Sequence, residues 1–534
     1  MRMMGNMDTI SVYELNVLKA SMMQYGSVDS VNNAKVFNGD GVMLSLKGEE
    51  LNGTIAVDGA VVAVNDLLNG KSSNPVLHNR ALAKLRTELN KYVKNGAFAK
   101  YLSGTNEEVV LENGDLKVKI SSKGGMITSA TLKKYKAYNA PEVELFDAKT
   151  NSYNFGLNTN SQHFDTKDFY FTPVSVNDST VIMQLDLGEG RKWGIKYTLP
   201  QNSYVVDMEV IQENMTGLIP QNIASMDFAW EQRINRHEEG KMFEEQNSGV
   251  YYKFLGGEVD YLSETTSDKE SYSDKFKWVS FKNQFFSSVL IANQDFENVT
   301  LSSKIQEKGS GYMKNYNAEM TTFFDPTGKE ATQLQMYLGP NHFKTLLASN
   351  DLCINKNEDP ELEDLVYLGW PIVRQINRWF TINLFDWLSG WGLNMGIVLL
   401  LMTIIVKIIV YPATRKSYIS SAKMRVLKPY IQKINEKYPN QEDALKKQQE
   451  TMQLYSEYGV SPMGGCLPML IQMPILIAMF RFFPASIELR GKSFLWSDDL
   501  SSYDSILDLP FNIPFYGDHV SLFCLLMTVV MFVY

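Results

Sequence analysis

The sequence predicts a multi-domain protein in which an all-β sandwich is followed by an α-helical transmembrane domain. Three observations support this prediction. Charge is distributed unequally along the chain, short alternating strands fill its middle, and long apolar runs occur near its end. The chain has 534 residues, which is more than one hydrophobic core usually organises, so we expect several domains.

Charge divides the chain at Gly390. Residues 1–390 carry a net charge of −11, and residues 391–534 carry a net charge of +2. The first part is expected to be an acidic, soluble body, whereas the second part confines its charges to loops. Neither part has the concentrated basic surface of a nucleic-acid-binding protein. The three cysteines lack the spacing of a disulfide framework or a zinc site, so we predict no metal and no cofactor.

The first 105 residues carry the weakest pattern. Leucines recur at helical spacing between residues 76 and 102 and predict one amphipathic helix. The stretch before this helix is polar, with short strands expected near Val42–Leu46 and Thr54–Val64. We predict a spacer, residues 1–105, with that single helix. The first 53 residues contain no apolar run of signal-peptide or membrane-span length.

A period-two pattern predicts a β-sandwich over residues 106–350. In Leu116–Ile120, apolar residues alternate with lysines, so one side of this strand faces a core. Many short strands separated by Gly, Asn and Pro are typical of a sandwich that ends near Leu347. Further strands are expected at Met126–Leu132, Val181–Leu187, Trp193–Leu199, Tyr204–Ile211, Trp278–Ala292 and Gln333–Leu338.

Two short segments precede the membrane domain. Residues 351–369 are acidic and are predicted to be a linker. Residues 370–390 are predicted to form an amphipathic helix in the plane of the membrane interface, because its apolar stripe is aromatic and its other side is basic. The stripe consists of Ile372, Ile376, Trp379, Phe380 and Leu384. An ordinary helix packed on a protein core is the alternative.

Three apolar runs predict membrane helices within residues 391–534. Residues 393–413 form a run of 21 residues that contains one charge, Lys407. Residues 466–484 form a run of 19 residues, and both runs are long enough to cross a bilayer. Residues 520–534 are 15 uncharged residues, fewer than the roughly 20 that a span needs. We therefore predict that the third span is incomplete and that the sequence is a fragment.

The loops between these runs predict the orientation. Residues 414–460 contain nine Lys or Arg and five Asp or Glu, whereas residues 485–519 contain two and six. The positive-inside rule then places residues 414–460 in the cytoplasm and residues 485–519 outside. The β domain also lies outside, so we predict a multi-pass protein of the inner membrane with its β domain in the periplasm.

The cytoplasmic loop is predicted to be a helical hairpin. Its two polar helices are separated at Tyr438-Pro439-Asn440, where the sequence favours a break. Its basic residues Lys423, Arg425 and Lys428 are candidates to contact lipid phosphates, a ribosome or a nascent chain. A merely solvated face is the alternative.

Lys407 constrains the function more than any other residue. Burying a charged side chain at the bilayer centre costs about 2.5–3.5 kcal/mol on insertion scales, so such a residue usually faces a partner or a wet cavity. Thr403 lies one turn away, and Gly396 lies further along the same helix face. Snorkelling is the alternative, because Lys407 lies roughly 9 Å from the cytoplasmic end of its run.

The second apolar run also carries polar and small residues on one side. Gly465, Pro468 and Gln472 share that side, and Pro474 removes a backbone hydrogen bond from the helix. Two such sides facing each other would enclose water that is open to the cytoplasm and closed outside. For Gln472, a simple interhelical hydrogen bond is the alternative.

Several motifs together resemble the YidC/Oxa-type family of membrane protein insertases. The stretch TIIVKIIVYPATRKSY resembles the start of the family's membrane core, and GGCLPMLIQMP is a very specific match to its next span. SSAKMRVLKPYIQKINEKYP resembles the family's cytoplasmic hairpin. WVSFKNQFFSSVLIA and MYLGP resemble the closing strands of the periplasmic domain of Gram-negative members. The resemblance covers residues 107–534.

This resemblance implies a five-helix core around a hydrophilic groove, preceded by an anchor helix and a periplasmic β-supersandwich similar to galactose mutarotase. Nascent membrane proteins would enter from the cytoplasm, alone or with the Sec translocon, and membrane lipids would surround the core. Lys407 falls where many members have an arginine, and Thr403 matches the family's groove threonine. Leu467 and its neighbours Met469 and Met473 match the apolar surface along which substrates slide. The first anchor and the last spans are missing, which implies truncation at both ends.

The predicted mechanism involves no covalent chemistry. A wet, positively charged pocket attracts an acidic substrate tail, and an apolar segment then gains free energy by moving into lipid. One rival is a membrane-anchored, mutarotase-like enzyme, for which His163 and His237 are the best candidates for catalysis. A second rival is a periplasmic scaffold, which would make no demand for Lys407 or Gln472 in the bilayer.

Overall fold

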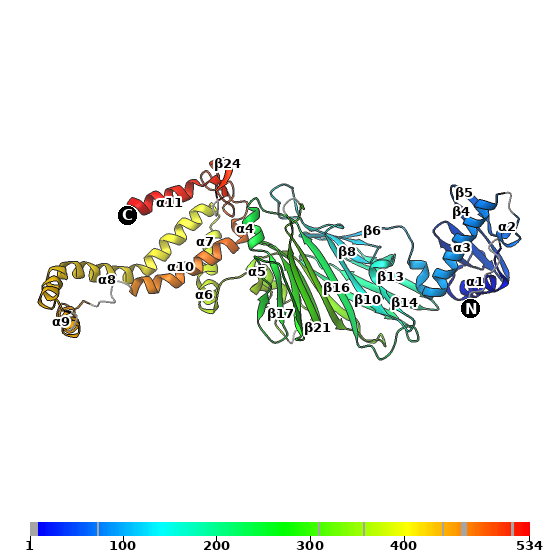
Figure 1. The fold of residues 1–534 in the computed structure, drawn as a ribbon, viewed down its shortest axis with the longest axis horizontal. Helices are drawn as coiled ribbons and strands as arrows, with labels where there is room; N and C mark the ends of the chain where they lie inside the picture. Colours follow the sequence, from blue (N-terminus) through cyan, green and yellow to red (C-terminus); the bar gives the residue numbers. More distant parts are fainter. Residues whose placement is uncertain are drawn as a thin grey trace. The chain divides into compact units, whose positions relative to one another are not determined.

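The chain folds into two compact units, seen in a computed structural model that describes residues 9–71, 74–307, 310–355, 358–440, 443–460, 467–513 and 517–533 (Figure 1). The first unit comprises Met1–Pro340 and Thr345–Leu362. The second unit comprises Asn341–Lys344 and Glu363–Tyr534. The chain therefore passes from one unit to the other at three peptide bonds.

The first unit begins with a small α/β domain, so the prediction of a polar spacer over residues 1–105 was wrong. Tight turns at Asp40-Gly41 and Asp58-Gly59, with positive φ at each residue, join strands whose alternate residues are buried. Phe37 of the sheet stacks on Tyr92 of the long helix with ring centroids 3.6 Å apart. The elements are α1 (Val12–Tyr25), β1 (Ser27–Asp29), β2 (Ala34–Gly39), β3 (Val42–Lys47), β4 (Glu50–Val57), β5 (Ala60–Ala63), α2 (Val64–Leu68), α3 (Pro75–Asn95) and η1 (Gly96–Tyr101).

Two antiparallel sheets follow and confirm the predicted β-sandwich. The smaller sheet has the order β6-β7-β8-β9, with β6 at Glu108–Glu112, β7 at Leu116–Ser121, β8 at Met126–Leu132 and β9 at Val143–Phe146. The larger sheet has 14 strands, and β8 and β9 lie against it. Its main path is β11-β10-β16-β22-β21-β23-β15-β14-β13-β12. The strands are β10 (Asn151–Asn158), β11 (His163–Asp165), β12 (Thr172–Asn177), β13 (Thr180–Gly188), β14 (Arg191–Thr198), β15 (Val205–Glu213), β16 (Ser225–Ile234), β17 (Gly249–Phe254), β18 (Val259–Tyr261), β19 (Asp268–Tyr272), β20 (Phe276–Lys282), β21 (Phe286–Ile305), β22 (Lys314–Phe323) and β23 (Thr332–Pro340).

The sandwich differs from the prediction at two places. The single strand expected at Trp278–Ala292 is two strands, β20 and β21, because the chain reverses where the backbone N–H of Asn283 donates to the carbonyl of Phe286 at 2.7 Å. The sheet ends at Pro340, and the residues around Leu347 form helix α5 (Phe343–Asn350). Two short helices, η2 (Thr166–Asp168) and α4 (Lys241–Gln246), connect strands elsewhere.

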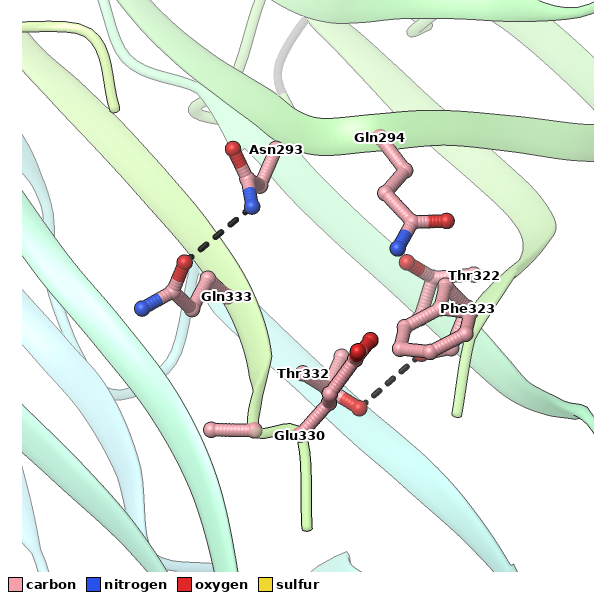
Figure 2. Close-up of a pocket in the computed structure, with 8 residues that line it drawn as sticks. Asn293, Gln294, Thr322, Phe323, Glu330, Thr332 and Gln333 are labelled. Carbon is pink, nitrogen blue, oxygen red and sulfur yellow. Dashed lines mark hydrogen bonds between the residues drawn. The ribbon is translucent and has the colours of Figure 1, made fainter. Parts of the chain in front are cut away.

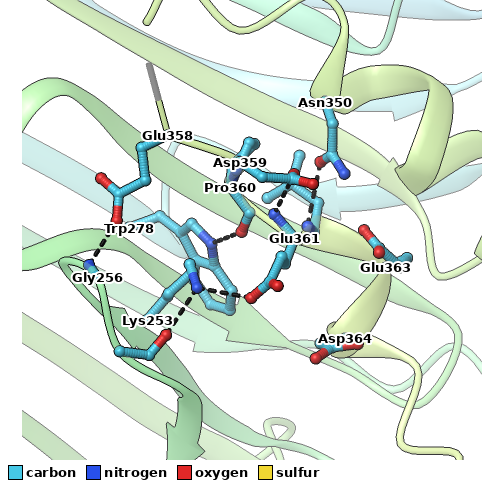
Figure 3. A network of polar contacts seen from close by, with 12 residues as sticks. Lys253, Gly256, Trp278, Asn350, Glu358, Asp359, Pro360, Glu361, Glu363 and Asp364 are labelled. Carbon is cyan, nitrogen blue, oxygen red and sulfur yellow. Dashed lines mark hydrogen bonds and ion pairs between the residues drawn. The ribbon is translucent and has the colours of Figure 1, made fainter. Parts of the chain in front are cut away.

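The segment predicted as a linker, residues 351–369, is packed instead (Figure 3). The buried Lys253 donates from Nζ to Oε2 of Glu361 at 2.7 Å, and the buried indole of Trp278 donates to the carbonyl of Pro360 at 2.7 Å. A short helix, η3 (Leu362–Leu365), begins directly afterwards. Because a buried ammonium needs a partner, this acidic stretch is held on the sheet and does not act as a free connection.

The second unit is helical. Helix α10 contacts α6 and α8, and α7 also contacts α8. The predicted pair of polar helices, Ser417–Glu436 and Gln441–Tyr458, is present. The first does not begin at Ser417, because α8 continues through Pro412 as one helix. The elements are α6 (Pro371–Ile376), η4 (Asn377–Thr381), α7 (Ile382–Ser389), α8 (Met395–Lys437), α9 (Ala444–Glu457), α10 (Leu467–Ala485), η6 (Ile487–Leu489), β24 (Leu507–Ile513), β25 (Gly517–Val520) and α11 (Leu522–Val533).

The helical stretch at residues 370–390 is not one regular α-helix, since η4 is a π-helical turn between α6 and α7. Its buried side contains Val373, Asn377 and Thr381, whereas Trp379 of the predicted stripe is 79% exposed. Arg378 pairs with Glu363 at 3.2 Å on the remaining side. The buried side also contains the apolar residues Ile382, Phe385 and Leu388. Of the predicted stripe, Ile372 and Trp379 are exposed and the other three residues are half-buried. A location in the membrane interface stays a prediction.

Candidate functional site

Lys407 and Thr403 lie on one exposed face of α8, four residues apart. Among the described residues, the segment Met395–Pro412 of α8 is the one helix that is long and apolar enough to cross a membrane. Within the same residues Lys407 makes no ion pair. The Thr403 hydroxyl donates to the carbonyl of Leu399 at 2.9 Å, a local bond within the helix. The ammonium of Lys407 is therefore available to water or to a bound chain.

Next to this polar face, α8 exposes an apolar face. Leu400, Ile404 and Ile408 recur every four residues and are 58%, 46% and 66% exposed. Val398 and Met402, on the side that packs against neighbouring helices, are buried. One helix thus presents a packed side, a polar face with Lys407 and Thr403, and an apolar face of the kind that suits lipid.

Helix α10 has a similar division. Gln472 is half-buried, and Met473, predicted to lie on the substrate slide, is exposed. The structure adds Leu470, Leu476 and Phe480, which are also exposed and which the sequence analysis did not name. Their helical spacing around Met473 was the signal that identifies them. Together these four residues form a continuous apolar face.

The remaining predicted residues of α10 and the turn before it are tested only in part. Gly465 lies outside the described residues, and for Leu467, Pro468 and Met469 the structure describes the helical backbone but not the side chains. Within the part of the chain whose side chains are described, no hydrogen bond joins Gln472 to α8. The alternative of a simple interhelical hydrogen bond for Gln472 therefore receives no support from this structure.

The outer end of the polar face is covered. Gly396 is buried, and a Cβ added there would overlap the ring of Phe494 at Cγ, Cδ1 and Cδ2. Asn394, the N-cap of α8, accepts from the N–H of Gly396 at 2.9 Å and donates to the carbonyl of Ser493 at 3.0 Å. The segment that follows α10 is thus attached to the first turn of α8.

The other end of α8 continues into the polar helix pair. The basic residues of the arm, Lys423, Arg425 and Lys428, are exposed. Exposure is expected both for a surface that contacts lipid, ribosome or nascent chain and for a merely solvated face, so it does not separate the two alternatives. Lys437 at the end of α8 pairs with Glu450 of α9. This pairing is exposed, so it contributes little to stability.

The histidines favoured by the enzyme alternative have separate surroundings. The backbone N–H of His237 donates to the buried Glu244 at 2.9 Å, and its ring packs edge-on against Phe286. His163 lies on strand β11, where its Nδ1 is 2.8 Å from Oδ1 of Asn158. The two rings therefore lie against different neighbours, Phe286 for His237 and Asn158 for His163.

The sandwich contains a hollow of about 260 Å³ between the middle of β21, the end of β22 and the start of β23 (Figure 2). Its walls are mainly amide and hydroxyl groups, and Asn293 donates to Gln333 across it at 3.1 Å. The hydroxyl of Thr332 donates to the carbonyl of Phe323 at 2.9 Å. Because the Asn293 and Gln333 amides already bond to each other, the hollow presents few free groups that would orient a ligand.

Two buried titratable side chains of the first unit form hydrogen bonds with their neighbours. Burial raises the pKa of Glu244 to about 7, although it accepts from the amide of Asn283 at 2.8 Å. Burial also lowers the pKa of Lys314 to about 8, where its ammonium donates to the carbonyls of Ser248 and Glu264 at 2.6 Å. Both side chains are fully buried, Glu244 on helix α4 and Lys314 on strand β22, and we assign them a structural role.

Comparisons with known proteins identify the family. Residues 108–385 match the family model described as the YidC periplasmic domain, and residues 387–534 match the 60Kd inner membrane protein. The chain belongs to the YidC family of membrane protein insertases. The membrane protein insertase YidC of Phocaeicola vulgatus is 55% identical over 426 residues, covering 80% of this chain and 68% of the relative. The membrane protein insertase YidC of Porphyromonas gingivalis is 40% identical over 446 residues, covering 82% of this chain and 71% of the relative.

Solved structures give weaker likenesses. The match to a crystal structure of an active YidC insertase covers 75% of this chain and 77% of the chain in that structure, with 17% identity and a TM-score of 0.24. The match to a galactose mutarotase-like protein from Lactobacillus casei covers 44% of this chain and 100% of that protein's chain, with 11% identity and a TM-score of 0.29. At these scores neither structure adds to the family assignment. The two YidC family models and the identities to YidC relatives carry it, and they support an insertase and not the enzyme or scaffold alternatives.

Proposed function

We propose that this chain inserts nascent membrane proteins into the inner membrane through a hydrated groove open to the cytoplasm. The observation that carries the proposal is the exposed Lys407 on the apolar helix α8, one turn from Thr403, which makes no ion pair with the residues that the structure describes. A charge at that depth is costly unless water or a partner reaches it. We assign Gln472, Gly465 and Pro468 of the neighbouring span to the same groove.

The two faces of α8 and α10 suggest how a substrate is handled. The acidic or polar tail of a nascent chain is attracted to the ammonium of Lys407, while its apolar segment lies against the exposed apolar residues of α10. Leu467, Met469 and Met473 are placed on this slide, and methionine side chains adapt to varied partners. The apolar segment then gains free energy by entering lipid, so no bond chemistry is required.

The surroundings of the groove complete the proposal. We infer a multi-pass topology with the β domain in the periplasm, since the basic loop at residues 414–460 favours the cytoplasm. The exposed Lys423, Arg425 and Lys428 are proposed to contact a ribosome, a nascent chain or lipid phosphates. Cooperation with the Sec translocon is proposed for longer substrates, and no cofactor or metal is required.

A pair of variants tests the proposal. We expect Lys407→Ala to lower insertion of a small, acidic-tailed substrate into vesicles several-fold, because the groove loses its positive charge. Lys407→Arg should retain insertion, since the charge remains. Lys433→Ala is the matched control, because Lys433 is exposed on the same helix and is not among the residues proposed to contact a partner. Equal insertion by the alanine variant and the parent protein would remove Lys407 from the mechanism.

A further inference from the structure

We propose that Phe494 is the outer seal of the groove, a positioning residue that keeps the polar face of α8 closed on the side opposite to the cytoplasm. This inference rests on the proposed function and deepens it, because it names the residue that separates the hydrated groove from the outside. It makes no use of a catalytic step.

The first support is the contact between Phe494 and Gly396. Gly396 lies on the same helix face as Thr403 and Lys407, seven and eleven residues before them, or about 10 and 16 Å along the axis. Its missing side chain leaves room for the base of the phenyl ring, since any Cβ would overlap Cγ, Cδ1 and Cδ2. The polar face therefore ends beneath an apolar ring.

The second support is the anchoring of the ring from the α8 side. The amide of Asn394 bonds to both the N–H of Gly396 and the carbonyl of Ser493, the residue before Phe494. One side chain thus starts the helix and holds the loop above it. This double use fixes the ring over Gly396 more firmly than apolar contact alone.

The third support is the anchoring from the other side. Phe494 and Ser497 exchange backbone hydrogen bonds of 2.9 and 3.0 Å, which closes a two-residue turn. Trp496 in that turn donates from Nε1 to the buried Asp504 at 2.9 Å and packs on Phe523 of α11 with ring centroids 4.6 Å apart. The turn is therefore attached to α8 at one end and to α11 at the other.

The turn holds one residue in a strained conformation to achieve this. Leu495 has φ of +55° and is 70% exposed, so it occupies a left-handed conformation that leucine rarely adopts. Such strain persists when the surrounding structure imposes it. Here its neighbours Phe494 and Trp496 both point to fixed partners, which forces the residue between them outward.

Thiol labelling tests the seal directly. In the full-length protein in native membrane vesicles, with Cys353, Cys466 and Cys524 replaced by serine, Thr403→Cys is labelled with a membrane-impermeant maleimide added to either side. We expect labelling from the cytoplasmic side only. Phe494→Ala should add labelling from the outer side, whereas Leu495→Ala, in the same turn but exposed, should not. Outer labelling that is absent in the Phe494 variant, or equal in both variants, overturns the proposal.

A second variant covers the case in which Phe494→Ala fails to fold. Gly396→Ala keeps the phenyl ring but displaces it, so it should also open the outer side to the maleimide. In the double variant the alanine methyl occupies part of the vacated space, so its outer labelling should be lower than the sum of the two single effects. Simple additivity would contradict direct contact. Insertion by Lys407→Ala is measured separately, so a failure of the proposed function is distinguishable from a failure of the seal.

Discussion

The packed acidic segment of the first unit makes an asymmetric prediction about stability. Lys253 and Glu361 form one ion pair, but their side chains are 5% and 44% exposed. Removing the charge of Glu361 leaves an ammonium buried in the sheet, where it also donates to the carbonyl of Gly257 at 2.8 Å. Removing Lys253 leaves a carboxylate that water can reach. The two deletions of the same pair should therefore differ in cost.

We expect Glu361→Gln to lower the free energy of unfolding by about 2 kcal/mol, because the amide oxygen can still accept from Nζ of Lys253 but no longer offsets its buried charge. The value is below the roughly 3–5 kcal/mol seen when a fully buried pair is broken, because Glu361 is partly solvated. Lys253→Met should cost about 1 kcal/mol or less, since an apolar chain of similar length replaces the buried charge and the exposed partner rehydrates.

Urea unfolding of the whole chain in detergent measures both values, with the fluorescence of the buried Trp278 and its neighbours as the signal. With a slope of about 2 kcal/mol per M, the Glu361→Gln midpoint should shift by about 1 M. Glu358→Gln is the matched control, since it lies in the same segment and can still accept from the N–H of Gly256. A larger loss for Lys253→Met than for Glu361→Gln would refute the reasoning.

Two further predictions concern buried carboxylates. The carboxyl of Glu244 has an ordinary pKa of 4.5, and burial raises its pKa in the folded state to about 7. Between these two pH values the folded state therefore binds more protons than the unfolded state. The free energy of unfolding should fall by about 3 kcal/mol as the pH rises from 4.5 to 7. Glu244→Gln should flatten the pH dependence of urea unfolding over that window, and parallel curves for variant and parent would contradict it. Asp504 accepts from the hydroxyl of Ser521 and the N–H of Phe523 at the start of α11. Asp504→Ala should therefore lower the free energy of unfolding by about 1–2 kcal/mol, because the hydroxyl of Ser521 and the N–H of Phe523 lose a charged acceptor. The same variant should speed proteolysis of the loop that contains Trp496, and an unchanged digestion rate would show that the loop is held by other contacts.

The sandwich and the apolar helices were predictable because their periodicity is strong. The alternating residues Leu116–Ile120 form strand β7 in the structure. The apolar run from 393 to 413 lies, from Met395 onward, in helix α8. The domain in residues 1–105 was missed because its strands are short. Its Asp-Gly turns at residues 40–41 and 58–59 carried the missing signal.

The candidate site was predictable only in its charged and polar members. Lys407 and Thr403 are recognisable because a charge and a hydroxyl are unusual in an apolar helix. Phe494 was not, since a phenylalanine in a loop gives no sign of the glycine beneath it, about 100 residues earlier in the sequence. Such long-range contacts depend on packing and not on local pattern.

Helix α8 joins the charged apolar segment and the basic arm in one element. Its 43 residues rise about 65 Å at 1.5 Å each, so the basic arm and the charged span form a single lever. Pro412 and Pro429 interrupt its hydrogen bonding and are the natural points of bending. Pro412 lies between Lys407 and the basic residues Lys423 and Arg425, so a bend at this proline would change the direction of the arm relative to the charged span while the helix stays continuous.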